Sequence, residues 1–295
     1  MAFRDAYQTV TDQIIANLEA GTVPWVKDWS RVEFGLPCNA VTNKPYRGIN
    51  VFLYFTSMAY YSSPRFLTYK QAKDAGGHVR KGEKGHVLYF FKPMVKNEGA
   101  ADEQRYAILR EYTVFNVDQC ENLSDTIRYG RTGKPGEVRW LNQDQRNELA
   151  DAFIKSTGAS FKEGKGQPMY IPSLDQIKMP KWEEFHHETG FYHTAFHELT
   201  HWTGAKSRLD RDLKPRFDRE AYAMEELVAE LGAAFMSAEF GYKVVDNSAA
   251  YIGGWLIALK NDKRAIFMAA AAAQKAVDFL RGKALEDTTT EEIAA

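Results

Sequence analysis

The residues best suited to chemistry form the run His197-Glu198-Leu199-Thr200-His201. On an α-helix, side chains four residues apart lie on the same face, so the two imidazoles can bind one metal ion. In this motif the glutamate acts as general base toward a water that the metal activates. The run therefore predicts a zinc peptidase site, in which Glu198 takes a proton from water and the resulting hydroxide attacks a substrate carbonyl.

A catalytic zinc site needs a third protein ligand and one open position. No histidine follows His201, so we expect a carboxylate. Residues 225–231 have a helical pattern and place three acids among apolar neighbours, where they would be buried and would need a partner. We predict that Glu226 is the third ligand and that Glu230 orients a ligand histidine. Glu225 and Glu230 are the alternative ligands.

The His, His and Glu set favours zinc, with Mn²⁺ or another divalent ion as the alternative. Other histidines lie nearby in the sequence, and we expect them to have surface or helix-capping roles: His186, His187 and His193. A tyrosine hydroxyl could donate a hydrogen bond to a developing oxyanion. Three tyrosines are candidates, with core packing as the default interpretation of each: Tyr192, Tyr222 and Tyr251.

The segment 41–96 combines positive charge with aromatic rings. It holds ten Lys or Arg residues against two acids, and eleven aromatic residues, although the chain as a whole has a net charge of −1. Cations that follow a phosphate backbone and rings that stack on unpaired bases are typical of single-stranded nucleic-acid binding. The alternative is a solvated basic face over a core that contains most of the rings. We predict phosphate contacts by Arg47, Lys70, Arg80, Lys81 and Lys84.

The elements that must position these residues differ between the two halves of the chain. Helical patterns over 1–20, 49–59 and 68–75 alternate with strand patterns over 86–91 and 111–117. Beyond residue 140 we expect a single strand over 169–177 among helices over 142–157, 183–203, 218–240, 250–260 and 262–281. The fold class is therefore α+β. We predict a nucleic-acid-binding α/β domain over 1–125, a linker over 126–140, a mainly helical metal-binding domain over 141–285 and a flexible tail over 286–295.

Composition and cysteine usage narrow the class of protein. The chain is 44% hydrophobic and 13% aromatic, which is typical of a globular protein with a sizeable core. Two cysteines, Cys38 and Cys120, are too few for a disulfide framework and are expected to be reduced thiols. The N-terminal residues lack the apolar core of a signal peptide, and no apolar run is long enough to span a membrane. We therefore expect a cytoplasmic protein.

Several motifs together resemble one known family, the ArdC antirestriction proteins of conjugative plasmids, which are similar to the N-terminal part of TraC-type plasmid primases. The motifs are the segments 46–50, 67–72, 79–85, 115–117, 196–204 and 225–231. The resemblance covers essentially the whole chain. It implies an N-terminal domain that binds single-stranded DNA, a C-terminal zincin-like metallopeptidase domain, and protection of incoming plasmid DNA from host restriction.

We accordingly predict a cytoplasmic antirestriction protein that binds single-stranded DNA and carries a zincin-type site with Glu198 as its catalytic residue. A host protein that acts on DNA would be its substrate or target, and no membrane partner is expected. Two alternatives remain. One is a DNA-binding decoy whose metal is purely structural. The other is a protease that single strands activate and that cuts DNA-bound proteins.

Overall fold

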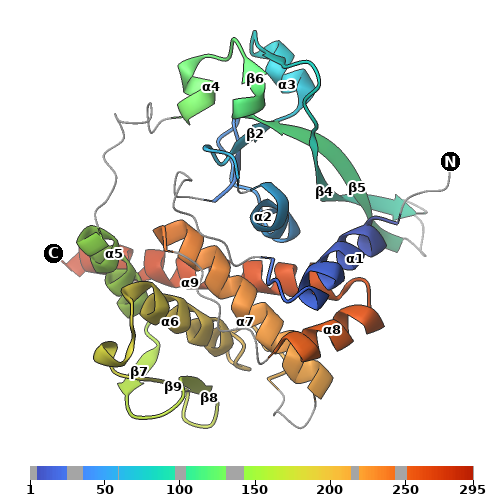
Figure 1. The fold of residues 1–295 in the computed structure, drawn as a ribbon. Coiled ribbons are helices and arrows are strands. Elements are labelled where there is room, and N and C mark those ends of the chain that lie inside the picture. The colour runs from blue at the N-terminus through green and yellow to red at the C-terminus, as the bar shows by residue number, and fades with distance from the viewer. Residues whose placement is uncertain are drawn as a thin grey trace.

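The fold is described from a computed structural model, which describes residues 5–24, 36–58, 60–96, 104–130, 143–213, 219–242 and 251–294. Short helices and strands alternate up to residue 130, and long helices dominate after residue 143 (Figure 1). The α+β class predicted from the sequence is thus confirmed. The N-terminal helices are α1 (Ala6–Glu19), α2 (Ile49–Leu53), the π-helical turn η1 (Tyr54–Met58), α3 (Tyr69–Asp74) and α4 (Asp125–Tyr129).

Local capping explains where two of these helices begin. The Asp5 carboxylate accepts hydrogen bonds from the first turn of α1, which satisfies backbone N–H groups that have no partner within the helix. Thr68 caps α3 in the same way, and the side-chain oxygen of Gln71 in turn accepts a hydrogen bond from the backbone N–H of Thr68. The helices predicted over 1–20 and 68–75 therefore begin and end within a few residues of the expected positions.

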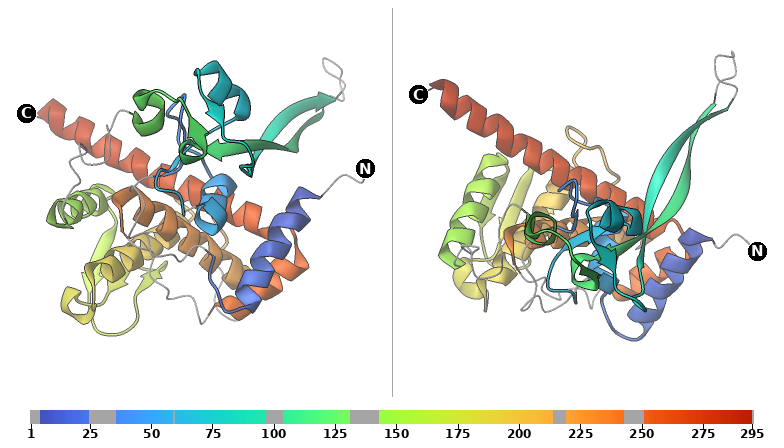
Figure 2. Two further views of the ribbon diagram at one scale, coloured as in Figure 1. Left: turned by 45° about the horizontal axis from the view of Figure 1, so that its top comes forward. Right: turned by 90° about the horizontal axis from the view of Figure 1, so that it is seen from above.

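A four-stranded sheet in the order β1-β2-β5-β4 forms the centre of the N-terminal part. Its strands are β1 (Cys38–Asn39), β2 (Arg65–Leu67), β4 (His86–Lys96) and β5 (Gln104–Asn116). β4 and β5 pair from His86 opposite Val114 to Lys96 opposite Gln104, and the outer part of this ribbon projects from the body (Figure 2). Both strands are longer than predicted, and the loop joining them lies outside the described residues. A second sheet pairs β3 (His78–Val79) with β6 (Cys120–Glu121).

The C-terminal part consists of helices with one small sheet. The helices are α5 (Gln143–Ser156), α6 (Glu188–Thr203), α7 (Arg219–Phe240), α8 (Ile252–Asn261) and α9 (Ala265–Ala294). The sheet has the order β7-β9-β8, formed by β7 (Ser160–Glu163), β8 (Met169–Ile171) and β9 (Gln176–Met179). The single strand predicted over 169–177 is wrong, because a turn with Asp175 at φ 47° separates β8 from β9. The backbone of 286–294, predicted to be a flexible tail, is helical as part of α9.

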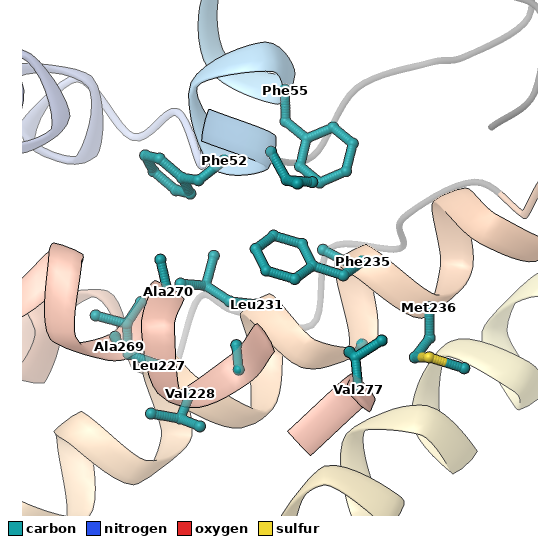
Figure 3. Packing of buried hydrophobic residues seen from close by; sticks show 14 of the residues in the cluster. Phe52, Phe55, Leu227, Val228, Leu231, Phe235, Met236, Ala269, Ala270 and Val277 are labelled. Carbon is teal, nitrogen blue, oxygen red and sulfur yellow. The ribbon is translucent and has the colours of Figure 1, made fainter. Parts of the chain in front are cut away.

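One large hydrophobic core draws on both halves of the chain. Phe52 of α2 and Phe55 of η1 face α7 and α9, where they meet side chains that include Leu231 and Phe235 (Figure 3). The ring centroids of Phe55 and Phe235 lie 6.0 Å apart. The predicted linker 126–140 begins within α4, and its remainder from residue 131 lies outside the described part of the chain. The domain boundaries therefore remain a prediction, while the contacts of α2 with α9 and of η1 with α7 are observed.

Two further observations concern the sequence expectations on membranes and thiols. None of the helices in the described ranges is both long and apolar enough to cross a bilayer. Cys38 and Cys120 are both free thiols, and Cys120 is buried in the small core under α3. Burial raises the pKa of the Cys38 thiol, although the nearby Arg65 acts in the opposite direction. These cysteines therefore contribute packing and no cross-link.

Candidate metal centre

The centre lies where α6 packs against α7. Close approach of the two helices depends on Gly232, because a Cβ atom at this position would lie 2.5 Å from Oγ1 of Thr200. His197 and His201 lie one turn apart on α6, and Glu226 faces them from α7. The local helical period sets the spacing of the histidines, and the packing of two helices brings the carboxylate to them.

The three predicted ligands converge on one point. The Nε2 atoms of His197 and His201 lie 3.1 Å apart. The Glu226 carboxylate approaches the first with Oε2 at 3.4 Å and the second with Oε1 at 3.6 Å. Metal–ligand bonds of about 2.0–2.2 Å in a tetrahedral site place ligand atoms roughly 3–4 Å apart. The observed separations therefore fit a single divalent ion bound by two imidazoles and a carboxylate.

Each histidine is oriented through its other ring nitrogen. Nδ1 of His197 lies 3.2 Å from Oε2 of Glu230, and Nδ1 of His201 lies 3.0 Å from Oε1 of Glu225. With each carboxylate accepting the Nδ1–H proton, Nε2 is left as the metal-binding atom, an arrangement typical of zinc-ligating histidines. Glu230 thus makes the contact with a histidine Nδ1 that the orienting role predicted for it requires. Glu225, considered in the sequence only as an alternative ligand, orients the second histidine.

Arg211 fixes Glu225 in place. Its guanidinium donates from Nε to Oε2 and from Nη2 to Oε1 of Glu225, each at 2.9 Å. The same guanidinium also donates to Oγ1 of Thr203 at 2.8 Å and to the carbonyl oxygen of Thr200 at 2.6 Å. Sequence reasoning missed this residue. Arg211 lies in an irregular segment after α6, where no periodic pattern indicates which side chain it will meet.

The acids and histidines hold each other in their charged forms. Burial opposes a charge on Glu226 and on Glu230, but the histidine partners outweigh it and lower the pKa of both carboxyls. Burial likewise disfavours a charged His201, yet hydrogen bonds to Glu225 and Glu226 raise its pKa to about 9. Oε2 of Glu226 is buried and forms no hydrogen bond to any described residue. A cation between the ligands would satisfy this oxygen, so the residues fit a divalent metal.

An open cavity of about 670 Å³ adjoins the ligands. Glu198, Tyr222 and Tyr251 line it together with the three ligands, and Tyr170 and Leu213 form part of its apolar wall. Burial, and then the Glu226 carboxylate, raise the pKa of Tyr222, so its hydroxyl stays protonated and able to donate. A reactant in this cavity would therefore meet an acid, two hydroxyls and the metal ligands at once.

The wall of the cavity is tied to α6 by Arg208. Its guanidinium donates to the Tyr170 hydroxyl at 3.0 Å and to the carbonyl oxygen of Trp202 at 2.6 Å. Asp175, in the turn between β8 and β9, accepts two further hydrogen bonds from it. Arg208 thus fixes β8 beside the helix that carries the histidines.

Comparison with known proteins identifies the family. Residues 148–272 match the family described as zincin-like metallopeptidase, and residues 4–115 match the N-terminal domain of anti-restriction factor ArdC. The metal-free crystal structure of the antirestriction ArdC protein from the R388 plasmid is 41% identical, with a TM-score of 0.79, and the match covers 96% of this chain and 98% of that one. The chain belongs to the ArdC antirestriction family. The resemblance drawn from the sequence is thus confirmed.

Further relatives bear on the metal and on the extent of the match. The Mn(II)-bound structure of the R388 ArdC protein is 42% identical, with a TM-score of 0.76, over 95% of this chain and 98% of that one. An uncharacterized protein of Sinorhizobium fredii is 37% identical over 95% of this chain and 92% of its own length. DNA primase TraC of Escherichia coli is 35% identical over 97% of this chain, which spans 28% of that primase. The zincin-like domain of this ArdC-family chain therefore implies a divalent metal.

Of the neighbouring residues in this ArdC-family protein, His193 departs from its expected role and Tyr192 keeps it. His193 is not on the surface: it is 1% exposed, its Nδ1 lies 3.0 Å from the Ser237 hydroxyl and its Nε2 lies 3.7 Å from Glu230. It is buried because it faces α7 one turn before His197. Tyr192 donates to Asp151 at 2.9 Å and packs in the core, so it takes its default role.

The predicted phosphate contacts fall into two groups. Arg80, Lys81 and Lys84 share the turn between β3 and β4, whereas Arg47 pairs with Asp278 of α9. Lys70 pairs with Asp74, one turn along α3, and Arg80 pairs with Glu83. Lys81 and Lys84 are exposed and form no ion pair with the described residues. Most of the eleven aromatic residues are covered, and the exposed ones are Tyr60, Tyr69, Phe90 and Phe91.

Proposed function

We propose that this ArdC-family protein binds single-stranded DNA, that its metal centre is a zinc peptidase site, and that it protects incoming plasmid DNA from restriction in the recipient cytoplasm. The observation that carries the enzymatic part is the convergence of two Nε2 atoms and a buried carboxylate beside Glu198 in an open cavity. A host protein that acts on DNA is the proposed substrate.

In the proposed reaction, a bound zinc ion supplies Lewis acidity and positive charge at the three ligands. Glu198 accepts a proton from the attacking water and delivers it to the nitrogen of the leaving amine. The Tyr222 hydroxyl donates a hydrogen bond to the substrate carbonyl oxygen as negative charge develops on it. His197 and His201 keep their Nε2 atoms available because Glu230 and Glu225 hold their Nδ1 protons.

The cavity favours a catalytic centre over a structural one. Structural zinc sites use four protein ligands and are closed to solvent, whereas catalytic sites keep a position open. Three converging ligands and an adjoining space of about 670 Å³ match the second arrangement among the described residues. A decoy with a structural metal needs neither the space nor Glu198.

The Glu198→Gln variant distinguishes a peptidase from a decoy with a structural metal. It removes the proton acceptor while retaining the side-chain size and all three ligands, so metal content should stay at the wild-type level. Protection of a transferred plasmid in a restricting recipient should fall, whereas Glu183→Gln, a change at an exposed acid before α6, should protect like the wild type. Undiminished protection by Glu198→Gln with metal retained would instead support the decoy.

Support for the DNA-binding part comes from the basic turn, residues 80–85 between β3 and β4. Lys81 and Lys84 have no acidic partner among the described residues, so their charge is available to phosphates. Four aromatic residues of the basic segment are exposed. Titration of a labelled oligothymidylate at several salt concentrations tests this part, because phosphate contacts give affinity that falls as salt rises. Affinity independent of salt would contradict it.

A further inference from the structure

Tyr60 is exposed and yet held in place. Its side chain is 66% exposed. Its ring centroid lies 4.3 Å from that of Tyr61, with 36° between the planes. Its hydroxyl donates to the Tyr61 hydroxyl at 3.1 Å and lies 3.4 Å from Nε2 of His86. An exposed tyrosine ordinarily samples several rotamers, so this combination gives an ordered ring with one face toward solvent.

The support beneath Tyr60 reaches the hydrophobic core. Nε2 of His86 lies 2.9 Å from the Tyr61 hydroxyl, and the two rings are nearly perpendicular with centroids 5.5 Å apart. Phe66, which is 1% exposed, packs edge-on against both of them at 6.0 and 6.3 Å. The outer ring of Tyr60 is therefore the last layer of a stack that begins in a buried strand.

The basic turn lies beside this stack because side chains of the short helix η2 (Val117–Gln119) form hydrogen bonds with both segments. The Asp118 carboxylate accepts hydrogen bonds from the backbone N–H and the hydroxyl of Ser62, at 3.0 and 2.7 Å. The next residue, Gln119, donates to the Glu83 carboxylate at 3.0 Å and to the carbonyl oxygen of Lys84 at 2.9 Å. Two residues of one turn thus position the segment that follows Tyr60 and the turn that carries the cations.

The charge beside Tyr60 is positive once the pairs are accounted for. Glu83 is paired with Arg80 and hydrogen-bonded by Gln119, and Asp118, which accepts hydrogen bonds from Ser62, leaves one negative charge against two lysines. Lys81 and Lys84 are exposed and unpaired within the described part of the chain. An ordered aromatic ring next to unpaired cations has the two features that single-stranded nucleic acid requires.

We propose that Tyr60 stacks on an unpaired base of single-stranded DNA whose phosphates contact Lys81 and Lys84. The inference rests on the proposed single-strand binding and adds to it the residue that stacks on a base. Because the ring is already ordered, binding does not have to immobilise it, and the stacking interaction is retained as affinity. A base in a duplex is already stacked and paired, so the site should prefer single strands over duplex.

The test uses the full chain and anisotropy of a labelled oligothymidylate. Tyr60→Ala should weaken binding roughly tenfold or more, as expected for loss of one stacked base. The dependence of affinity on salt should stay at the wild-type slope, because no phosphate contact is removed. Tyr60→Trp, which keeps a π-face, should retain binding. Ile257→Ala, a change at an exposed apolar side chain of α8, is the matched control and should have no effect.

The outcomes distinguish failure of the Tyr60 stacking site from failure of the proposed single-strand binding. If the wild type fails to bind the oligonucleotide, the proposed single-strand binding itself falls. If the wild type binds and Tyr60→Ala binds equally well with a wild-type melting curve, only the stacking site is wrong. Equal affinity of the wild type for duplex and single strand would also overturn it. Tyr60→Phe should lose less than Tyr60→Ala, and equal losses would show that the hydroxyl, not the ring, contributes the affinity.

Discussion

Arg211 holds the Glu225 carboxylate through two hydrogen bonds of 2.9 Å. Glu225 passes this constraint to His201, whose Nδ1 lies 3.0 Å from the same carboxylate. The candidate metal ligand His201 is therefore positioned by a residue that lies ten positions further along the chain and outside any helix. Glu230 of α7 has the corresponding role for His197. His193, which lies on α6 with His197, also approaches this carboxylate. The two histidines thus have separate supports.

Replacing Arg211 should weaken metal binding without removing a ligand. In Arg211→Lys the positive charge remains but the two-pronged contact with Glu225 is lost, so His201 is less firmly oriented. Loss of such supporting contacts typically costs about 10- to 100-fold in metal affinity. Zinc titration by calorimetry measures the change, and the ¹⁵N shifts of the His201 ring report its tautomer.

The matched comparison is Arg208→Lys. Arg208 contacts the cavity wall and Trp202 but neither ligand histidine, so its loss should leave zinc affinity close to the wild-type value. Equal losses of affinity in the two variants would show that Arg211 acts only by stabilising the fold.

Metal-free protein should lose stability as pH rises from about 6.5 to about 9. The pKa of His201 is about 9 in the folded chain, above the unfolded value of 6.5. A raised pKa means that the folded state binds the proton more tightly, so this stabilisation is complete below 6.5 and is lost as pH rises through 9. A shift of this size corresponds to about 3 kcal/mol.

Urea unfolding of chelator-treated protein between pH 6 and 9.5 measures this dependence. His201→Gln lacks the titrating group and should have a flatter profile over the same range. Zinc affinity should change in the opposite direction, rising with pH, because the ion must displace the protons. A wild-type profile that rises across this interval would contradict the assignment.

The helical spacing of the metal motif is a local property, which is why the sequence alone placed His197 and His201 on one face. The burial of Glu226 and Glu230 followed from acids that share a helix face with small residues. The partners of Glu225 and Glu230 on the same helix could not be derived in this way. Arg211 reaches Glu225 from an irregular segment, and His193 is buried because α7 lies against it. Both contacts depend on the tertiary arrangement of α6, α7 and the segment that follows α6.

Backbone detail limited the fold prediction in a similar way. The strand expected over 169–177 contains Asp175 at φ 47°, a left-handed turn that the apolar pattern did not reveal. The aromatic residues of the basic segment show a comparable limit. Composition identified eleven rings, but only the tertiary packing distinguishes the buried Phe52 from the exposed Tyr60.

Removing the unpaired cations should lower both the affinity for single-stranded DNA and its dependence on salt. For Lys81→Ala with Lys84→Ala, two phosphate contacts would be lost. The slope of log K against log salt should become less steep by about 1.4, given a contribution of about 0.7 per contact in single strands.

The comparison variant is Lys70→Ala, in which the removed cation is already paired with Asp74. Its effect on the slope should be smaller, because the local charge available to phosphate changes less. The oligonucleotide titration described for Tyr60 provides both quantities, affinity and slope. An unchanged slope in the double variant would remove Lys81 and Lys84 from the interface.

The zinc-to-protein ratio, measured beside single-strand affinity in the wild type, His197→Ala and Glu226→Ala, tests the metal centre most directly. We expect one zinc per wild-type chain, no zinc in either variant, and oligonucleotide affinity retained in both, because the basic turn is remote in sequence from the ligands. Zinc retained in Glu226→Ala would exclude this carboxylate as the third ligand. A wild-type chain that binds no metal would contradict the proposed centre itself.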